Sequence, residues 1–289
     1  MNVPAVALAV GLMVAQTPSS APVAAGLYHW RTGPITLETA LLGIGPGHVL
    51  IVTEDHVVAR HHEHQLAVLQ ALKQRGLRVS VGLEFLTYPD QPWVDRYVRG
   101  DVPEEMFLRA VRWGGTPFEW YRPLIAFPRE AGGETVALNA PEQVTKALAQ
   151  RGPEGLSDEE RSLLPPGFTV GNAAYFERFA REVQQHGSLP ENAVRNFFAA
   201  QSAWDDTMAW RAARFLEAHP EQVLVIIVGD FHASYGGGLP DRLWARGVTK
   251  TVVISQVDAR GLDEAGLQAL LAPDPRDGPR ADFIWITGP

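Results

Sequence analysis

Short apolar runs alternate with longer amphipathic stretches along most of the chain, and this alternation predicts the fold. The runs are continuously apolar, which is typical of strands that are buried on both faces. They cover His48–Thr53, Arg78–Phe85, Thr135–Asn139, Val223–Val228 and Thr251–Val257, with Phe283–Thr287 as a further edge strand. Because helices separate these strands, we expect an α/β fold with a mainly parallel central sheet covered by helices.

Apolar positions three and four residues apart mark the helices between the strands. We expect helices at His61–Gln74, Glu104–Trp113, Pro141–Gln150, Tyr175–Gln185 and Glu191–Ala218. The intervals 87–134 and 151–220 hold more helix than one crossover requires, and we expect them to form a helical cap over the sheet. No low-complexity linker divides residues 26–289, which we interpret as a single domain with these two helical insertions.

The first 25 residues differ from the rest of the chain. Val3–Ala15 is apolar, and no charged side chain precedes Arg31. A run of this length is too short to cross a bilayer and is typical of a secretory signal, with cleavage expected after Ala25. We therefore expect an exported protein, periplasmic or at the cell surface; a disordered or membrane-tethered tail is the alternative. With no cysteine in the chain, a lipoprotein anchor is not expected.

Composition narrows the chemistry that remains. The 289 residues include 25 Lys and Arg against 33 Asp and Glu, a formal charge of −8. Such a chain lacks the basic field that general nucleic-acid binding requires, so no nucleic-acid partner is expected. Without cysteine there are no thiolate nucleophiles, disulfides or thiolate metal sites. Any metal or cofactor must be held by histidines, carboxylates or tyrosines.

Polar residues follow the predicted strands where the sheet should end. Two strands end in the same pattern, namely Thr53-Glu54-Asp55-His56 and Gly229-Asp230-Phe231-His232. Two other strands end at Glu84 and Asn139. Because ligands of α/β sheets bind beyond the carboxyl ends of the strands, we expect His56, Glu84 and His232 to converge, with Glu54 and Asn139 close by. Such a set suits a divalent metal ion or acid–base chemistry, and loop or capping roles are the alternative.

Two helices add polar residues to the same region. His62 lies one turn before the apolar stripe of the first helix, so we expect it to face the core, and His61 and His64 to lie outward as solvated or capping residues. In Glu191–Ala218, Gln201 and Asp205 occupy core positions. Buried polar groups require partners, so both residues either form a structural network or reach the site of His56 and His232.

The order of these motifs resembles that of the ChaN-like haem-binding uptake family, within the wider Tiki superfamily. The similarity spans about Tyr28 to Val257, although Thr53 stands where the superfamily's first glycine would be. The matching elements are Glu54, His56, His62 and Gln65; Gly82-Leu83-Glu84-Phe85 with Gln91; Tyr121-Arg-Pro-Leu, Phe127-Pro-Arg129 and Ala137-Leu-Asn139; Gln201-x-x-Trp204-Asp205-x-x-Met208-Ala209; and Gly229-x-x-His232 with Gly238-x-Pro240-x-Arg242.

The resemblance implies an exported bacterial protein of haem and iron uptake that binds haem through tyrosine and dimerises with it. A phenolate suits ferric haem iron, and Tyr28 and Tyr235 are the two candidate ligands. Gln201, Asp205 and Arg242 are further candidate haem-site residues. The wider superfamily implies the alternative, a metal-dependent hydrolase of the erythromycin-esterase type. Its metal would lie on His56, Glu84 and His232, with Glu54 or His62 in proton transfer.

Overall fold

The computed structural model describes residues 24–185, 187 and 189–288. Within them an eight-stranded sheet has the order β2-β1-β8-β7-β3-β6-β4-β5. The strands are β1 (Gly26–His29), β2 (Gly33–Ile35), β3 (Val49–Glu54), β4 (Arg78–Thr87), β5 (Thr135–Asn139), β6 (Gln222–Gly229), β7 (Thr251–Asp258) and β8 (Phe283–Thr287). The predicted signal peptide lies almost entirely in residues 1–23, outside the described residues.

The mainly parallel α/β sheet predicted from the apolar runs is confirmed. Strands β3 to β8 pair only in parallel with one another, whereas β1 is antiparallel to both β2 and β8. All six predicted strands are present, but β8 is not the edge strand that was expected, because β1 pairs with its outer side and β2 lies beyond β1. The pattern missed β1 and β2, which are only four and three residues long and carry no continuous apolar run.

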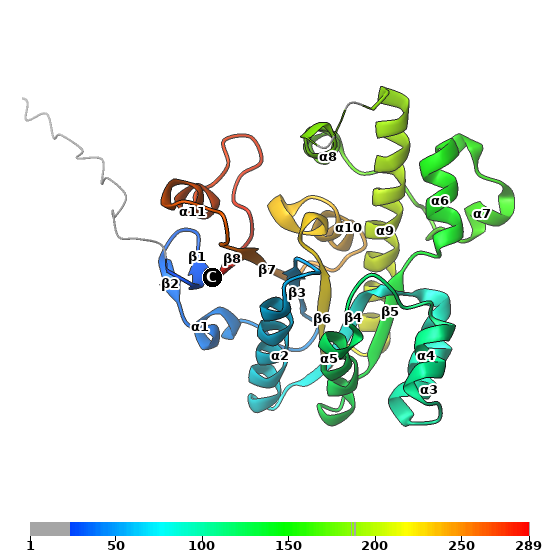
Figure 1. Ribbon diagram of the computed structural model, residues 1–289. Coiled ribbons are helices and arrows are strands. Elements are labelled where there is room, and N and C mark those ends of the chain that lie inside the picture. Colours follow the sequence, from blue (N-terminus) through cyan, green and yellow to red (C-terminus); the bar gives the residue numbers. More distant parts are fainter. Residues whose placement is uncertain (1–23, 186, 188, 289) are drawn as a thin grey trace, which may run out of the picture.

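Helices cover both faces of this sheet (Figure 1). They are α1 (Leu37–Leu41), α2 (Ala59–Gln74), α3 (Gln91–Arg99), α4 (Glu104–Ala110), α5 (Phe118–Glu130), α6 (Glu142–Arg151), α7 (Asp158–Ser162), α8 (Ala173–Gln185), α9 (Glu191–Ala218), α10 (Leu239–Ala245) and α11 (Glu264–Leu271). Helices α2 and α5 lie on one side of the sheet, and α9 and α10 on the other (Figure 1). The two helical insertions therefore divide between the faces and do not form one cap.

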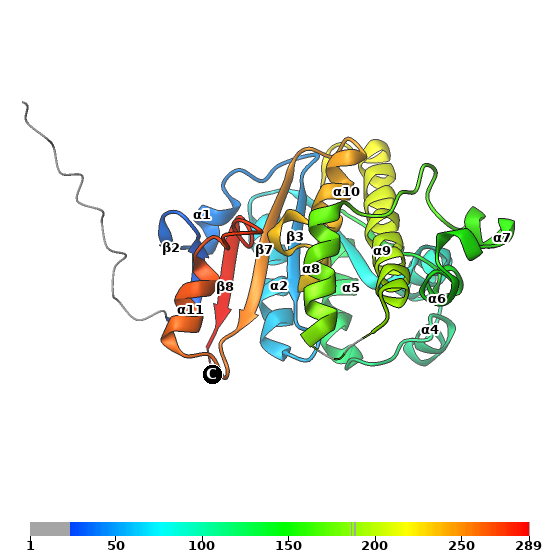
Figure 2. The same ribbon diagram turned by 90° about the horizontal axis from the view of Figure 1, so that it is seen from above.

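The parity of each strand decides which core its side chains enter, because successive side chains point to opposite faces. Leu50 and Val52 of β3 pack with α2 and α5, whereas Ile51 packs with Met208 of α9. The carboxyl ends of β7 and β8 point the same way in the view from above (Figure 2). Side chains at the ends of β3, β4 and β6 can therefore meet at that edge from either face.

Helix α5 was not predicted, because it contains Pro123 and Pro128. Proline removes a helical hydrogen bond and normally ends a helix. Here Tyr121, Leu124 and Ile125 are buried at helical spacing, and their packing against the sheet and α2 outweighs the proline cost. The helix carries Tyr121 to the end of β3.

None of the helices in the described part of the chain has both the length and the apolarity needed to span a membrane.

Candidate functional site

Glu54, the last residue of β3, is the centre of the first half of the site. Its carboxylate lies 2.8 Å from Nδ1 of His56, accepts a 2.7 Å hydrogen bond from the Gln65 amide, and accepts another from the Tyr121 hydroxyl. Glu54 is only 2 % exposed, so these partners replace water around a buried carboxylate. Burial raises the pKa of Tyr121, and the Glu54 charge raises it further, so this phenol stays protonated and donates.

His62 lies behind Glu54, as the helical pattern predicted. It is buried, and its Nδ1 is 3.4 Å from the Glu54 carboxylate and 3.1 Å from the Gln65 amide oxygen. Its ring stacks on Trp120 with 5.3 Å between centroids. His62 therefore belongs to the support of Glu54 and does not line the cavity described below.

His232 is the centre of the second half and bridges two carboxylates. Its Nε2 lies 3.2 Å from Glu84 and its Nδ1 2.6 Å from Asp205. Burial disfavours the imidazolium, but the charges of Glu84 and Asp205 outweigh burial and raise the pKa of His232 to about 10. Burial alone would raise the pKa of Glu84, yet His232 and His56 lower it to about 2. The pairing with Glu84 and Asp205 thus favours the charged form of His232.

Helix α9 supplies the outer partners of His232. Asp205 accepts a 2.9 Å hydrogen bond from the Tyr175 hydroxyl, and the Gln201 amide lies 2.9 Å from Nδ1 of His232. Burial raises the pKa of Asp205 and of Tyr175. Of the two sequence-based alternatives for Gln201 and Asp205, the structure therefore shows the one in which both reach His232.

The two halves meet at Gly229, the last residue of β6. Its backbone N–H donates a 2.7 Å hydrogen bond to Glu84. A methyl group on Gly229 would lie 3.1 Å from Nε2 of His56 and 3.6 Å from Glu84. The absence of a side chain therefore lets His56 approach the Glu84–His232 pair. Asn139, also expected here, donates to the backbone carbonyl of Glu84 at 2.9 Å.

The two similar strand-end motifs are not equivalent in space. Glu54 pairs with Gly229 in the sheet, so the motifs are offset by one residue. Asp230 consequently does not hold His232; it accepts 2.6 Å hydrogen bonds from Thr53 and Ser255 and pairs with Arg280. Thr53 stands where the superfamily pattern has a glycine, and its hydrogen bond to Asp230 stabilises the turn.

A cavity of about 520 Å³ opens over this edge of the sheet. Its lining includes Glu54, His56, Gly229, His232 and Arg280. The His56 side chain is 37 % exposed, whereas the Glu54 side chain is fully buried. Burial disfavours the charge of His56, but its hydrogen bond to Glu54 and the charge of Glu84 raise its pKa overall. The arrangement can accept or donate a proton at Nε2 of His56.

The structure brings His56, Glu84 and His232 together but does not form the metal cage considered from the sequence. Each ring nitrogen of His232 instead lies against a single carboxylate, Nε2 at 3.2 Å from Glu84 and Nδ1 at 2.6 Å from Asp205. Throughout the described residues, no group of three or more His, Asp or Glu side chains is placed to hold a metal ion.

Tyr235 lies beside the strand-end cavity, whereas Tyr28 does not. Tyr28 is buried in β1, and its hydroxyl donates to the Ala24 carbonyl at 2.8 Å. Tyr235 is half-buried and lines an adjoining cavity of about 490 Å³, which shares Asp230, Phe231 and Arg280 with the first. Arg242 lines neither cavity; it bonds Asp241 and Thr169.

The prediction that His61 and His64 lie outward was wrong, although the capping role expected as one alternative applies to His61. His61 is fully buried, and its Nδ1 accepts a 2.9 Å hydrogen bond from the Asp55 backbone, so it caps the β3–α2 turn from inside. His64 is half-buried and stacks on Trp285 with 4.0 Å between centroids. The strand β8 covers this face of α2, and the helical pattern alone did not show that a second face would be buried.

Sequence reasoning assigned no site role to three of the residues that build the site: Tyr121, which it quoted only within a family motif, Tyr175 and Arg178. A signal for each was present. Tyr121 shares a helical face with Leu124 and Ile125, and Arg178 stands one turn after Tyr175 on a face that also holds Phe179. The argument that identified Gln201, a polar residue at a core position, applies equally to Arg178.

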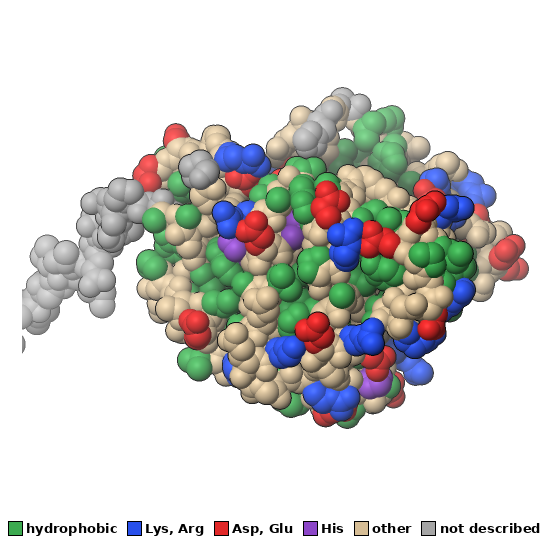
Figure 3. Space-filling view, turned by 60° about the horizontal axis from the view of Figure 1, so that its bottom comes forward, with side chains coloured by type: hydrophobic (Ala, Val, Ile, Leu, Met, Phe, Trp, Pro, Cys, Tyr) green, Lys and Arg blue, Asp and Glu red, His purple; other side chains and the backbone are tan. Residues whose placement is uncertain are grey.

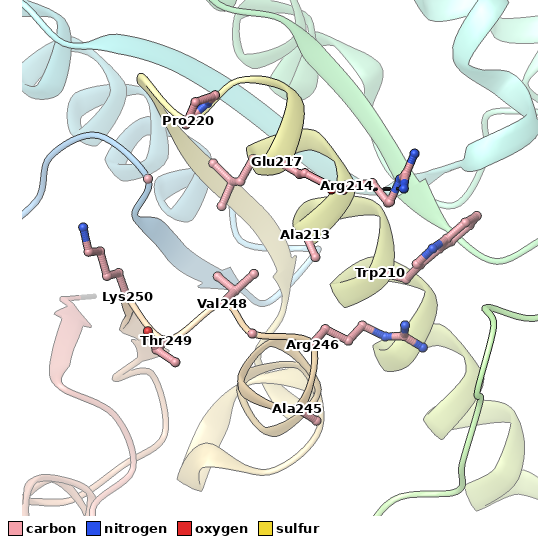
Figure 4. A pocket seen from close by; sticks show the side chains of 13 residues that line it. Trp210, Ala213, Arg214, Glu217, Pro220, Ala245, Arg246, Val248, Thr249 and Lys250 are labelled. Atoms are coloured by element: carbon pink, nitrogen blue, oxygen red, sulfur yellow. Dashed lines mark ion pairs between the residues drawn. The ribbon is translucent and has the colours of Figure 1, made fainter.

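A larger cavity of about 760 Å³ lies at the opposite end of the sheet (Figure 4). It opens between the end of α9 and the α10–β7 loop, and its lining includes Trp210, Arg214 and Lys250. It contains none of the candidate residues. On the face in Figure 3, acidic and basic side chains are interspersed, and no broad patch of one sign is visible.

Comparisons with known proteins agree with this geometry. A sequence model of the family described as "Haem-binding uptake, Tiki superfamily, ChaN" matches residues 44–243, and the chain belongs to this family. The solved structure described as cofacial haem binding to ChaN of Campylobacter jejuni superimposes with a TM-score of 0.63 at 17 % identity, over 89 % of this chain and 94 % of that one. This likeness shows the fold.

One curated protein and one further solved structure are also similar to this chain. The chain is 24 % identical to RETICULATA-RELATED 5, a chloroplastic protein of Arabidopsis thaliana, over 92 % of its own length. It spans only 36 % of that curated relative. A mutant erythromycin esterase in its open conformation gives a TM-score of 0.43 at 12 % identity over 73 % of this chain and 70 % of that one, too low to carry an argument.

Proposed function

We propose that this protein binds haem in the cavity lined by Tyr235, with the Tyr235 phenolate as the iron ligand. One observation carries the choice of ligand. Each of the other five tyrosines bonds a protein oxygen through its hydroxyl; the partners are Ala24, Leu163, Glu104, Glu54 and Asp205. Tyr235 instead contacts guanidinium groups: its side chain hydrogen-bonds that of Arg280, and Arg178 and Arg280 lie 5.3 and 5.6 Å from its ring centre.

The lining of this cavity fits the chemistry of haem. Phe231 and Tyr235 offer aromatic surface to a porphyrin, and Arg276 offers a partner for its propionate carboxylates. Arg181 also lines the cavity, where it pairs with Asp277. The volume of about 490 Å³ falls in the range of small-molecule sites. Bound haem would supply a ferric iron, and a phenolate ligand stabilises that oxidation state.

Titration of the purified chain with haemin tests the proposal. We expect a saturable Soret change with a ferric-tyrosinate spectrum, and loss of that spectrum in Tyr235→Phe. Tyr28→Phe is the matched control, because its phenol lies in β1 with its hydroxyl bonded to Ala24. A tyrosinate spectrum that survives in Tyr235→Phe overturns the ligand assignment, and the lack of saturable binding overturns haem binding itself.

We also propose that the protein acts after export, in haem and iron uptake. The support is the apolar stretch Val3–Ala15 with small residues up to Ala25. To check this, the chain is expressed, isolated from the periplasmic fraction and sequenced from its N-terminus. Gly26 is the expected first residue of the mature chain. An intact Met1 on the isolated protein would contradict it.

A second candidate function is acid–base chemistry at His56, and its partly exposed position beside buried Glu54 favours it. With Nδ1 held by Glu54, Nε2 is the nitrogen that would take a proton from a water attacking an ester carbonyl. Hydrolysis of a panel of chromogenic esters should fall by about 10²-fold or more in His56→Ala. His219→Ala, far from the cavity, is the control, and equal rates in both variants would exclude His56 as the base.

A further inference from the structure

The segment 230–236 carries both His232 and Tyr235, and it is held by an arginine from another element. Arg178 of α8 donates from Nη2 to the Phe231 carbonyl at 3.1 Å. From Nη1 it donates to the Ser234 carbonyl and to the Ser234 hydroxyl, the latter at 3.1 Å. A single guanidinium therefore satisfies oxygens on both sides of His232.

The same guanidinium lies among aromatic rings. Its central carbon is 5.2 Å from the ring centre of Tyr175, 4.7 Å from that of Phe231 and 5.3 Å from that of Tyr235. Arg178 is only 8 % exposed, and none of its hydrogen-bond partners among the described residues is a carboxylate. The charges of Asp277, Asp230 and Asp205 act favourably on this cation, but its hydrogen bonds go to uncharged oxygens of the 230–236 segment. The N–H groups of Arg178 therefore do more than fill space, because they hydrogen-bond the 230–236 segment.

Tyr235 itself needs such a restraint. Its φ of 60° and ψ of 21° place a bulky residue in the left-handed region, a strained conformation that persists only where surrounding contacts fix it. The contacts are the Arg178 guanidinium and a 2.6 Å hydrogen bond from the Tyr235 N–H to the Arg280 carbonyl. The following backbone also lies against Arg178, since a methyl group on Gly237 would be 3.3 Å from its Nη2.

We propose that Arg178 is a positioning residue for haem binding, which fixes the 230–236 segment so that the Tyr235 phenol is presented to the ligand. The inference rests on the proposed function of Tyr235. By holding the segment in one conformation before binding, Arg178 removes an ordering cost that haem would otherwise bear. Lysine in its place keeps a charge but cannot donate to three oxygens in a fixed fork.

The first test concerns the segment and needs no haem. In Arg178→Ala, amide hydrogen exchange in a peptide covering 230–237 should be faster than in the parent protein. The exchange rate in Arg178→Lys should lie between the rates of these two proteins. Arg195→Ala is the matched control, because Arg195 also lies over an aromatic ring, Phe176 at 5.0 Å, but contacts no part of this segment. Unchanged exchange in Arg178→Ala overturns the positioning role.

The second test concerns haemin. Arg178→Ala should weaken haemin binding by about tenfold and diminish the tyrosinate spectrum, whereas a merely structural role would lower the melting temperature and leave the spectrum intact. Combined with Tyr235→Phe, it should cause no further loss of affinity, because Arg178 acts through Tyr235. Additive losses overturn the inference. Unaltered haemin binding by Tyr235→Phe alone overturns the proposed ligand, and the exchange experiment then still decides whether Arg178 fixes the segment.

Discussion

At the scale of single residues, the site is a pair of histidines with opposite surroundings. His56 has one carboxylate partner and a partly exposed ring, whereas His232 is buried between two carboxylates. The first can exchange a proton with a ligand in the cavity. The second is a fixed charge that organises the strand ends.

Replacing His232 should destabilise the fold. In His232→Asn, two buried carboxylates lose their cation, and we expect the free energy of unfolding to fall by about 3–5 kcal/mol. His219→Asn loses a partly exposed contact of 3.4 Å with Glu134 and a ring contact with Phe215, and should cost only about 1 kcal/mol. Urea denaturation measures both, and similar losses would contradict the account.

The same ion pair predicts that the free energy of unfolding falls at alkaline pH. The pKa of His232 is raised in the fold from 6.5 to about 10. Its stabilisation is therefore complete below pH 6.5 and is lost as the pH rises toward 10. The difference in stability between the parent and His232→Asn should shrink over this range, and a constant difference would show that His232 is not charged in the fold.

The buried His61 predicts that the free energy of unfolding also falls at acidic pH. Burial lowers its pKa from 6.5 to about 4, so the unfolded chain takes up the proton first. Stability should fall by about 3 kcal/mol as the pH drops from 6.5 to 4. His61→Gln, which can still accept from the Asp55 N–H, should reduce this loss of stability. Thermal denaturation at several pH values measures it; an unchanged slope would assign the acid sensitivity to other groups.

At the scale of elements, tertiary packing overrides local preference most clearly in α5. The burial of Tyr121, Leu124 and Ile125 stabilises this helix although it contains two prolines. Helix α9 shows the opposite case, in which the polar residues Gln201 and Asp205 occupy core positions because they contact His232. Each helix delivers one hydroxyl or carboxylate to the ends of the strands.

Pro123 is exposed within α5, so its replacement should stabilise the protein. Pro123→Ala restores a helical N–H, and we expect a gain of about 1–3 kcal/mol, reduced by the greater freedom of the unfolded chain. Ala126→Gly, on the same exposed side, should lose about 1 kcal/mol. Denaturant midpoints measure both, and a loss of stability in Pro123→Ala would mean that the proline fits a bend the helix requires.

At the scale of the whole molecule, the expected partner is a second copy joined through haem, in line with the proposed haem site. Light scattering should show a mass increase of the purified chain on adding haemin, and no increase in Tyr235→Phe. Arg195→Ala, which leaves the cavity unchanged, should behave like the parent. A mass that haemin does not alter would restrict the proposal to haem binding by single chains.

The sequence by itself determined the parallel strands, the long helices and the convergence of Glu54, His56, Glu84 and His232 at one edge. These follow from local periodicity and from the rule that parallel strands end together. It also placed Gln201 and Asp205 in the core. All of these inferences use neighbours along the chain or a single topological rule.

Only the tertiary structure decided which partners each group has. The offset of one residue between β3 and β6 assigned Asp230 to Arg280 and left Glu84 and Asp205 to hold His232. That pairing places His232 between two carboxylates, whose charges outweigh burial and raise its pKa. Burial of His61 beneath β8 and the clamp of Arg178 on Tyr235 were likewise invisible in the sequence, because contacts between distant segments depend on register and packing, which periodicity does not encode.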